Sequence, residues 1–286
     1  MYEIKYYIPE TKTIKTATFI RSLKVGTGIK DMEYDEDSLE YKLVWSDEFD
    51  GTALDTKNWN YETGTGSGGW GNNELQYYTN STNNVFVTDG KLHIKAIKEK
   101  RGNSNYTSAR ITTKNKADYK YGRFEASIKL PSGRGIWPAF WMMPTNSAYG
   151  GWPNSGEIDI MEHVGYNPGL VHSTIHCELY NGMIGTQRGG NKNLGNTIYD
   201  DFHVYAVEWF PDKMTFYVDD IEVFEYKPAN KTQKNWPYDQ KFFMILNVAV
   251  GGNWGGAQGV NDAIFPTEMV VDYVRVYQSD QLANFQ

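Results

Sequence analysis

Short runs in which apolar and polar residues alternate recur along most of the chain. Residues 84–99 (NVFVTDGKLHIKAIKE) alternate on both sides of an Asp-Gly pair, the commonest signal for a hairpin turn. Residues 121–131 and 268–278 alternate in the same way, whereas residues 241–252 form an almost continuous apolar run. Alternation predicts strands with one buried face, and the apolar run predicts a strand buried on both faces. Patterns typical of helices are scarce, so the chain is predicted to be an all-β sandwich or jelly roll.

The first 41 residues differ from the rest of the chain in their pattern. Residues 2–20 are compatible with a short hairpin, and residues 30–40 (KDMEYDEDSLE) form an acidic, polar stretch that we interpret as a linker or a solvated edge. We therefore expect an N-terminal extension or linker over residues 1–41 and one β domain over residues 42–286. A single all-β domain of this size is ordinary.

Composition narrows the classes of partner. The chain of 286 residues carries a formal net charge of −7, which argues against nucleic acid and anionic membranes as partners. It contains no run of about 18 apolar residues that would span a membrane. Its first residues lack the apolar segment of a signal peptide, and its single cysteine, Cys177, excludes an internal disulfide. Nine Trp and 21 Tyr predict either a well-packed β core or an aromatic-lined surface.

One apolar, strand-like segment contains three carboxylates within six positions. Residues 154–165 (NSGEIDIMEHVG) hold Glu157, Asp159 and Glu162 among isoleucine, methionine and valine. In a regular strand Glu157 and Asp159 point to one face and Glu162 points to the other. A β-bulge near Ile160-Met161 inserts one residue and returns Glu162 to the first face, whereas a helix would set the two glutamates about 140° apart. We therefore predict a bulged strand.

Three carboxylates on one face predict acid–base chemistry. The bulge leaves the glutamates about four strand positions apart, or roughly 13 Å between backbones. Side chains that lean together would approach about 5 Å, which is the separation found in retaining glycosidases. Asp159 lies between them, where a hydrogen bond to one glutamate would separate their pKa values. The alternative is a solvated acidic strand face, which fits poorly with the apolar neighbours.

A metal site is a second alternative for this region. His163, His172 and His176 follow the acidic segment, and the last two are four residues apart. The segment lacks the glutamate of the zinc-binding helix motif, and its pattern is that of a strand. We therefore predict that catalysis needs no metal and no other cofactor.

Four segments resemble family 16 of the glycoside hydrolases, and specifically its laminarinase-like endo-β-1,3-glucanases. In chain order they are GWGNNELQYYT (69–79), the run over residues 106–144, GEIDIMEHVG (156–165) and LNVAVGGNWGG (246–256). LVWSDEFDG (43–51) is similar to the usual start of the domain. The resemblance thus covers residues 43–278.

The resemblance implies a β-jelly-roll sandwich of two curved antiparallel sheets with a substrate cleft on the concave face. It implies retaining endo-hydrolysis of β-1,3-glucan, with mixed-linkage β-1,3-1,4-glucan as a further candidate substrate. Glu157 matches the family nucleophile, Glu162 the acid/base and Asp159 the assisting acid. Two alternatives stay open: a galactan hydrolase of the agarase or carrageenase kind, and a non-catalytic β-glucan-binding protein, which would typically have lost acidic-segment glutamates.

The same resemblance supplies candidate substrate-binding residues. They are Asn73, Arg110, Trp137, Trp141, Trp152 and His176. Indole rings suit the C–H faces of sugars, Arg110 is expected to favour the ionised form of Glu157, and His176 is expected to point its imidazole at the acid/base. For each residue a purely structural role is the alternative, such as core packing, a loop hydrogen bond or a surface ion pair.

The family often carries a structural Ca²⁺ on its convex side. Glu48, Gly90 and Asp272 match the positions of that site, with backbone carbonyls among the ligands. We expect a monomer whose partner is a β-glucan polysaccharide or oligosaccharide, with no nucleic acid and no membrane. We also expect a secreted or cell-surface location, with the signal peptide absent from this sequence.

Overall fold

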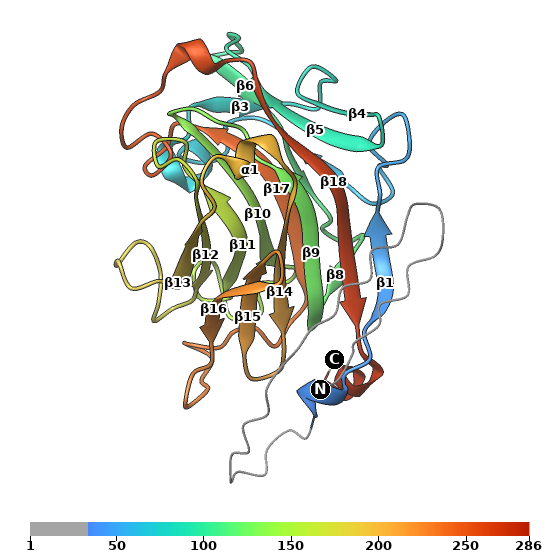
Figure 1. Ribbon diagram of the computed structural model, residues 1–286. Helices are drawn as coiled ribbons and strands as arrows, with labels where there is room; N and C mark the ends of the chain where they lie inside the picture. Colours follow the sequence, from blue (N-terminus) through green and yellow to red (C-terminus); the bar gives the residue numbers. More distant parts are fainter. Residues whose placement is uncertain (1–33, 286) are drawn as a thin grey trace.

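The computed structural model of the protein describes residues 34–285, so the hairpin expected over residues 2–20 lies outside the described residues. Two sheets of eight strands each face one another across a hydrophobic core (Figure 1). All strand pairs within these two sheets are antiparallel. The prediction of an all-β jelly-roll sandwich is confirmed.

The first sheet is built around the long last strand. Its order is β16 (Ile221–Tyr226), β15 (Met214–Val218), β14 (His203–Trp209), β9 (Gly122–Lys129), β18 (Thr267–Gln278), β5 (Lys91–Ala96) and β4 (Val85–Thr88), and β1 (Lys42–Asp47) also pairs with β18.

The second sheet carries the acidic segment near its middle. Its order is β13 (Arg188–Asn193), β12 (Leu170–His176), β11 (Glu157–His163), β10 (Ile136–Pro144), β17 (Phe242–Val250), β7 (Arg110–Thr112) and β2 (Asn60–Glu62), and β8 (Asp118–Tyr119) also pairs with β17. A small parallel pair joins β3 (Gln76–Tyr78) to β6 (Tyr106–Ser108). The helical elements are short: α1 (Thr197–Asp200), 3₁₀ turns at Glu36–Ser38, Asp262–Ile264 and Asp280–Phe285, and an irregular turn at Gly69–Asn73.

The strands follow the sequence patterns closely. β4 and β5 form the predicted hairpin, and Asp89 and Gly90 at its turn both have positive φ, as a tight hairpin turn requires. β17 coincides with the continuous apolar run, and all nine of its residues are buried. It pairs with β10, which in turn pairs with the acidic strand β11 in the same sheet.

Residues 34–41 pack against the β domain. Tyr34 stacks on Phe210 with ring centroids 5.4 Å apart, Leu39 is buried, and Glu36 pairs with Lys213 at 2.6 Å. The acidic residues of this stretch thus meet basic and aromatic partners near the turn between β14 and β15.

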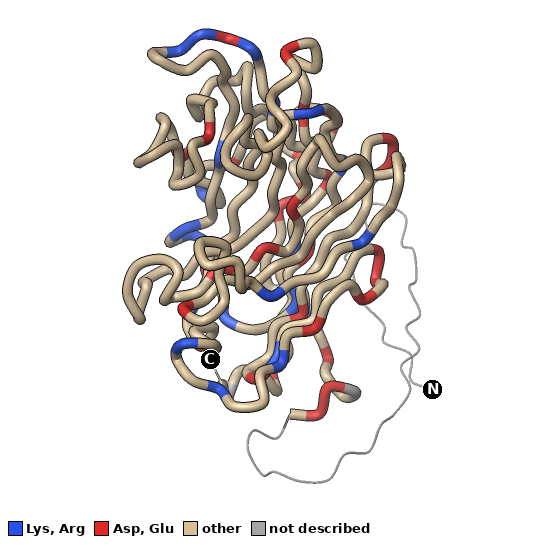
Figure 2. Tube along the Cα trace, turned by 90° about the vertical axis from the view of Figure 1, so that its left-hand side faces the viewer, with Lys and Arg blue, Asp and Glu red and all other residues tan. Residues whose placement is uncertain are grey.

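Charged residues of both signs are interspersed along the described chain (Figure 2). The pKa values at any one site are therefore set mainly by the charged and polar side chains next to it. Within residues 34–285, no helix combines the length and the apolar character needed to cross a bilayer.

Candidate active site

The acidic strand β11 contains the predicted bulge. Opposite β12, Asp159 pairs with Thr174 and Glu162 pairs with His172, so Ile160 and Met161 together face the single residue Ser173. The Ser173 hydroxyl donates to the carbonyl oxygen of Ile160 at 2.9 Å and satisfies the backbone group that the bulge displaces. The uneven spacing of the acids therefore corresponds to a real irregularity in the sheet.

The bulge brings both glutamates to the same face. Glu157 lies opposite His176 and Glu162 lies opposite His172. These two histidines are four residues apart on a regular strand, so they and their partners share the face that points away from the core. Ile158, Ile160 and Met161 are fully buried in the core instead. We call Glu157, Asp159 and Glu162 the acid cluster.

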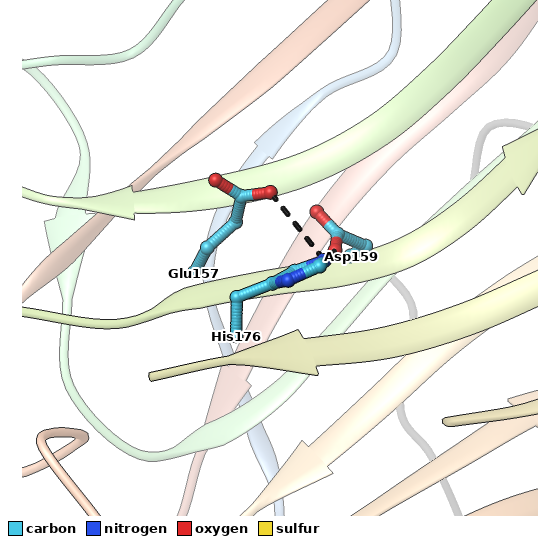
Figure 3. Close-up of side chains that lie close together, drawn as sticks. All are labelled: Glu157, Asp159 and His176. Atoms are coloured by element: carbon cyan, nitrogen blue, oxygen red, sulfur yellow. Dashed lines mark ion pairs between the residues drawn. The ribbon is translucent and has the colours of Figure 1, made fainter. Parts of the chain in front are cut away.

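His176 connects the acid cluster to the neighbouring strand. Its Nε2 lies 3.2 Å from Asp159 Oδ2 and 3.9 Å from Glu157 Oε1, and the three side chains point toward one another (Figure 3). Its Nδ1 accepts a hydrogen bond from the backbone N–H of Gly182 at 3.1 Å. An accepting Nδ1 leaves the proton of the neutral ring on Nε2, so Gly182 fixes the tautomer whose N–H faces the carboxylates.

Trp137 contacts the other end of the acid cluster. Its indole Nε1 donates to Glu162 Oε1 at 3.0 Å. Trp137 and Trp141 are four residues apart on β10, so both side chains lie on the same face as the acids. Trp141 donates to Asn247 Oδ1 at 2.7 Å, and the Asn247 amide donates to the hydroxyl of Tyr78 at 3.1 Å. A row of hydrogen-bonded aromatic side chains therefore runs beside the acids.

Burial raises the pKa of all three acidic groups. Burial, followed by the charge of Asp159, raises the pKa of Glu157 to about 8, while His176 and a hydrogen bond from Trp152 oppose the increase. Burial raises the pKa of Glu162 to about 7. Burial and the charge of Glu162 raise the pKa of Asp159 well above its usual value. The acid cluster therefore retains protons near neutral pH, as general acid catalysis requires.

A hydrogen bond joins Asp159 and Glu157, and it raises the pKa of Glu157 while it lowers that of Asp159. The Asp159 side chain is 3% exposed and the Glu157 side chain is 18% exposed. After burial, the charge of Asp159 is the largest cause of the raised pKa of Glu157. A neutral Asp159 would therefore favour the ionised form of Glu157 that a nucleophile requires.

Comparison with known proteins places this geometry in a family. The model of the family described as "Glycosyl hydrolases family 16" matches residues 72–275. The beta-glucanase of Rhodothermus marinus is 46% identical over 276 residues, which cover 93% of this chain and 96% of that protein. The chain belongs to glycosyl hydrolase family 16. The resemblance noted in the sequence is thereby confirmed, and so is the class of enzyme, a glycoside hydrolase.

Two further similarities support the family 16 assignment. The X-ray structure of the laminarinase from Rhodothermus marinus aligns with a TM-score of 0.81 and 48% identity, covering 85% of this chain and 99% of that one. Glucan endo-1,3-beta-glucosidase A1 of Niallia circulans is 45% identical over 259 residues, or 82% of this chain, which spans 38% of that longer protein.

Arg110 has different partners from those expected in this family 16 site. Its guanidinium lies between the indoles of Trp70 and Trp141, 4.6 Å and 4.8 Å from their centroids, and it forms an ion pair with Glu62. Burial raises the pKa of the carboxyl of Glu74, and the charge of Arg110 opposes that increase. Glu62 and two aromatic faces engage its charge, and the groups that shift the pKa of Glu157 are Asp159, His176 and Trp152, so the structure gives no support to the expectation that Arg110 keeps Glu157 ionised. Its predicted contact with sugar stays a prediction.

Asn73 and Trp152 lie at the two sides of the acid cluster. Asn73 is exposed in the turn at Gly69–Asn73, and its amide donates to Asn253 Oδ1 at 2.9 Å. Trp152 is 41% exposed, lies 6.0 Å from the ring of His176 and donates a hydrogen bond to Glu157. Asn73 thus already makes a loop hydrogen bond, whereas Trp152 presents an open indole face beside the nucleophile position.

Sequence reasoning missed two side chains that the fold brings to the acid cluster. Trp254 packs edge-on against Trp137 at 5.5 Å and against His172 at 5.1 Å. His172 faces Glu162 across the strand pair, and burial lowers its pKa. Trp254 lies in LNVAVGGNWGG, one of the segments that resemble family 16, so the resemblance could have identified it as a site residue. His172 was considered only as a metal ligand.

The described residues include one group with the spacing of a metal site. Glu157, Asp159 and His176 place ligand atoms within 4.8 Å of one another. A histidine that binds a metal through Nε2 normally donates its other N–H to an acceptor, but Nδ1 of His176 instead faces the N–H of Gly182. His163 lies elsewhere, between Leu170 O and the Tyr199 hydroxyl. The group therefore fits proton transfer better than metal binding.

The predicted calcium residues converge at a gap beside β18. β5 pairs with β18 as far as Val271, and β1 pairs with it again only from Val274. Glu48 follows β1, Gly90 precedes β5, and Asp272 lies in the gap between them.

The side chains at this gap fit only part of the predicted ligand set. Both carboxylate oxygens of Glu48 accept hydrogen bonds from Arg275, at 2.9 Å and 2.7 Å. Asp272 Oδ1 lies 3.7 Å from Lys91 Nζ. The residues therefore fit a calcium ion through backbone carbonyls and the carboxylate of Asp272, and not through the carboxylate of Glu48.

Proposed function

We propose that the protein is an endo-acting, retaining β-1,3-glucanase that also accepts mixed-linkage β-1,3-1,4-glucan. The observation that carries this proposal is the bulge of β11, which places two glutamates with raised pKa values on one open face with Asp159 between them. The similar proteins are a beta-glucanase, a laminarinase and a glucan endo-1,3-beta-glucosidase, and their activities support the choice of polymer.

The geometry supports a double displacement. Ionised Glu157 attacks the anomeric carbon while Glu162 gives its proton to the departing glycosidic oxygen, so the C–O bond breaks as the sugar ester of Glu157 forms. Water then attacks the same carbon, Glu162 takes the proton from that water, and the ester bond to Glu157 breaks. In this proposal Asp159, once protonated, donates a hydrogen bond to the ionised nucleophile, His176 Nε2 lies 3.2 Å from Asp159 Oδ2, and the indole of Trp137 orients Glu162.

We expect the protein to release reducing sugar from laminarin at least about tenfold faster than from agarose or carrageenan, with lichenan in between. Neutral β-linked glucose rings suit the uncharged aromatic row beside the acid cluster. The measurement is the initial rate of reducing-end formation on each polymer at equal mass concentration. Faster cleavage of a galactan would replace the glucanase proposal with the galactanase alternative, and laminarin binding without cleavage would favour a glucan-binding protein.

We also infer that a structural calcium ion binds at the gap beside β18. It would join the end of β1 to the β4–β5 hairpin, next to β18, with which both β1 and β5 pair. The carboxylate of Asp272 and nearby backbone carbonyls would supply hard oxygen ligands. The site lies in the other sheet from the acid cluster, so the ion would contribute to stability and not to the chemistry.

Removal of calcium with EDTA should lower Tm by roughly 5–10 °C, the shift expected when an ion at about 100 times its Kd is withdrawn. Differential scanning calorimetry with added calcium or EDTA measures this shift. Activity measured well below the transition should stay unchanged in EDTA. Asp272→Asn should reduce the calcium-dependent shift, while Asp219→Asn, at an exposed turn away from the gap, should preserve it. An unchanged Tm in EDTA and in added calcium would rule out the ion.

A further inference from the structure

The loop between β12 and β13, residues 177–187, exposes an unusual amount of apolar surface. Of the large hydrophobic side chains exposed within residues 34–285, Met183 is 79% exposed, Ile184 61% and Leu179 44%, and all three lie in this loop. Residues 179–187 (LYNGMIGTQ) contain no charged side chain. A cluster of exposed apolar residues without charges is typical of a surface that binds a neutral ligand.

The exposure does not come from a loosely held loop. Asn181 is buried, and its side-chain amide donates to the carbonyls of Cys177 and Glu178 at 3.1 Å and 3.2 Å. Its side-chain oxygen accepts the N–H of Met183 at 3.1 Å. The hydroxyl of Thr186 donates to Leu179 O at 3.0 Å. Met183 and Ile184 are therefore presented on an ordered backbone, which reduces the entropy lost when a ligand binds.

The loop is joined directly to the acid cluster. Gly182, next to Met183, donates its N–H to His176 Nδ1 at 3.1 Å, and a Cβ added at Gly182 would lie 3.6 Å from the imidazole. The opposite nitrogen of His176 faces Asp159. Trp152, the other exposed aromatic residue at this end of the site, lies 6.0 Å from the same imidazole. The apolar loop surface and the exposed indole thus flank His176.

We propose that Met183 and Ile184 form an additional binding subsite for a long β-1,3-glucan chain, beyond the sugars that contact the acid cluster. The proposal rests on the glucanase function proposed above. Glucose rings present C–H faces that pack on apolar side chains, and the lack of charge in residues 179–187 suits a neutral polymer better than a sulfated one. The loop leads from β12 into β13, the edge strand of the second sheet (Figure 1).

The test measures binding in a background that cannot cut the polymer. In Glu157→Gln protein, the double substitution Met183→Ser and Ile184→Ser should raise the Kd for laminarin about tenfold, because each lost apolar contact weakens binding several-fold. The Kd for laminaribiose, which is too short to reach the loop, should change less than about twofold. The matched control replaces Val44 and Ile221, two exposed apolar residues of the other sheet, by serine, and should leave both constants unchanged.

The outcomes separate this proposal from the function on which it rests. An unchanged Kd for laminarin in the Met183/Ile184 double variant would overturn the subsite. An equal loss of affinity for laminarin and laminaribiose would also overturn it, because the loop would then act by positioning His176. Failure of the glucanase proposal would appear instead as laminarin that the unmodified protein binds but does not cleave.

Discussion

Glu157→Gln should lower kcat/KM on laminarin by about 10⁴-fold or more, because glutamine keeps the size of the side chain and removes the nucleophile. Initial rates of reducing-end release measure the loss. The matched control is Glu178→Gln, which changes a partly exposed carboxylate paired with Lys234, in the loop between β16 and β17. It should keep activity within about twofold, as surface substitutions usually do. Retention of more than about a hundredth of the activity by Glu157→Gln would contradict the role of Glu157.

The same variant should be more stable than the unmodified protein at alkaline pH. Burial raises the folded-state pKa of Glu157 to about 8 from an ordinary value of 4.5. A carboxyl with a raised pKa contributes its full stability below pH 4.5 and loses it as pH rises through 8. Glutamine cannot ionise, so the Tm of Glu157→Gln should exceed that of the unmodified protein at pH 8, and the two should converge toward pH 4.5. A difference in Tm between the two proteins that grows toward acid pH would show that the pKa of Glu157 is lowered, and not raised, in the folded state.

Glu162→Gln should also lose about 10²–10⁴-fold on laminarin, whose leaving group needs a proton. It should still react with a dinitrophenyl β-laminaribioside, because that leaving group departs without protonation. Azide should then speed turnover, since a small anion can attack the glycosyl-enzyme without help from a general base.

The pH profile supplies an independent check of Glu162. Burial raises its pKa to about 7, so kcat/KM of the unmodified protein on laminarin should fall as pH rises above 7 and the acid loses its proton. On the dinitrophenyl substrate, Glu162→Gln should lack this alkaline decline. An unchanged decline in the variant, or no effect of azide on its rate, would assign the proton transfer to another residue.

The position of the acids could be predicted because it depends on strand geometry alone. One additional residue between Asp159 and Glu162, compared with the spacing between Glu157 and Asp159, requires a bulge if all three are to share a face, and β11 contains that bulge. The alternating runs predicted β4, β5, β9 and β18 for the same reason, since side-chain direction in a strand has a period of two.

The electrostatics of the site could not be predicted in the same way, because they depend on contacts between distant segments. Arg110 is engaged by Glu62 and Trp70, which lie far from it in sequence. The tautomer of His176 depends on the N–H of Gly182, a backbone group in a loop that no periodicity describes. Sequence indicated which residues approach the acid cluster, but their charge and protonation follow from tertiary neighbours.

The residues expected to bind calcium could be predicted from the sequence only in part. The order of segments brings Glu48, Gly90 and Asp272 to one gap beside β18, in agreement with the expected place. The ion pair between Glu48 and Arg275 was not foreseen. It arises because Asp47 pairs with Val274 in the register of β1 and β18, which sets the side chains of Glu48 and Arg275 near each other.

The measurement that tests the assignment of roles most directly is the anomeric configuration of the glycosyl azide formed by Glu162→Gln. If Glu157 is the nucleophile, it attacks first and azide then displaces it from the opposite face, so two inversions give the β-azide. Proton NMR of the product from the dinitrophenyl β-laminaribioside distinguishes the two anomers. We expect the β-azide; an α-azide would mean that Glu162 is the nucleophile and that the roles of the two glutamates are reversed.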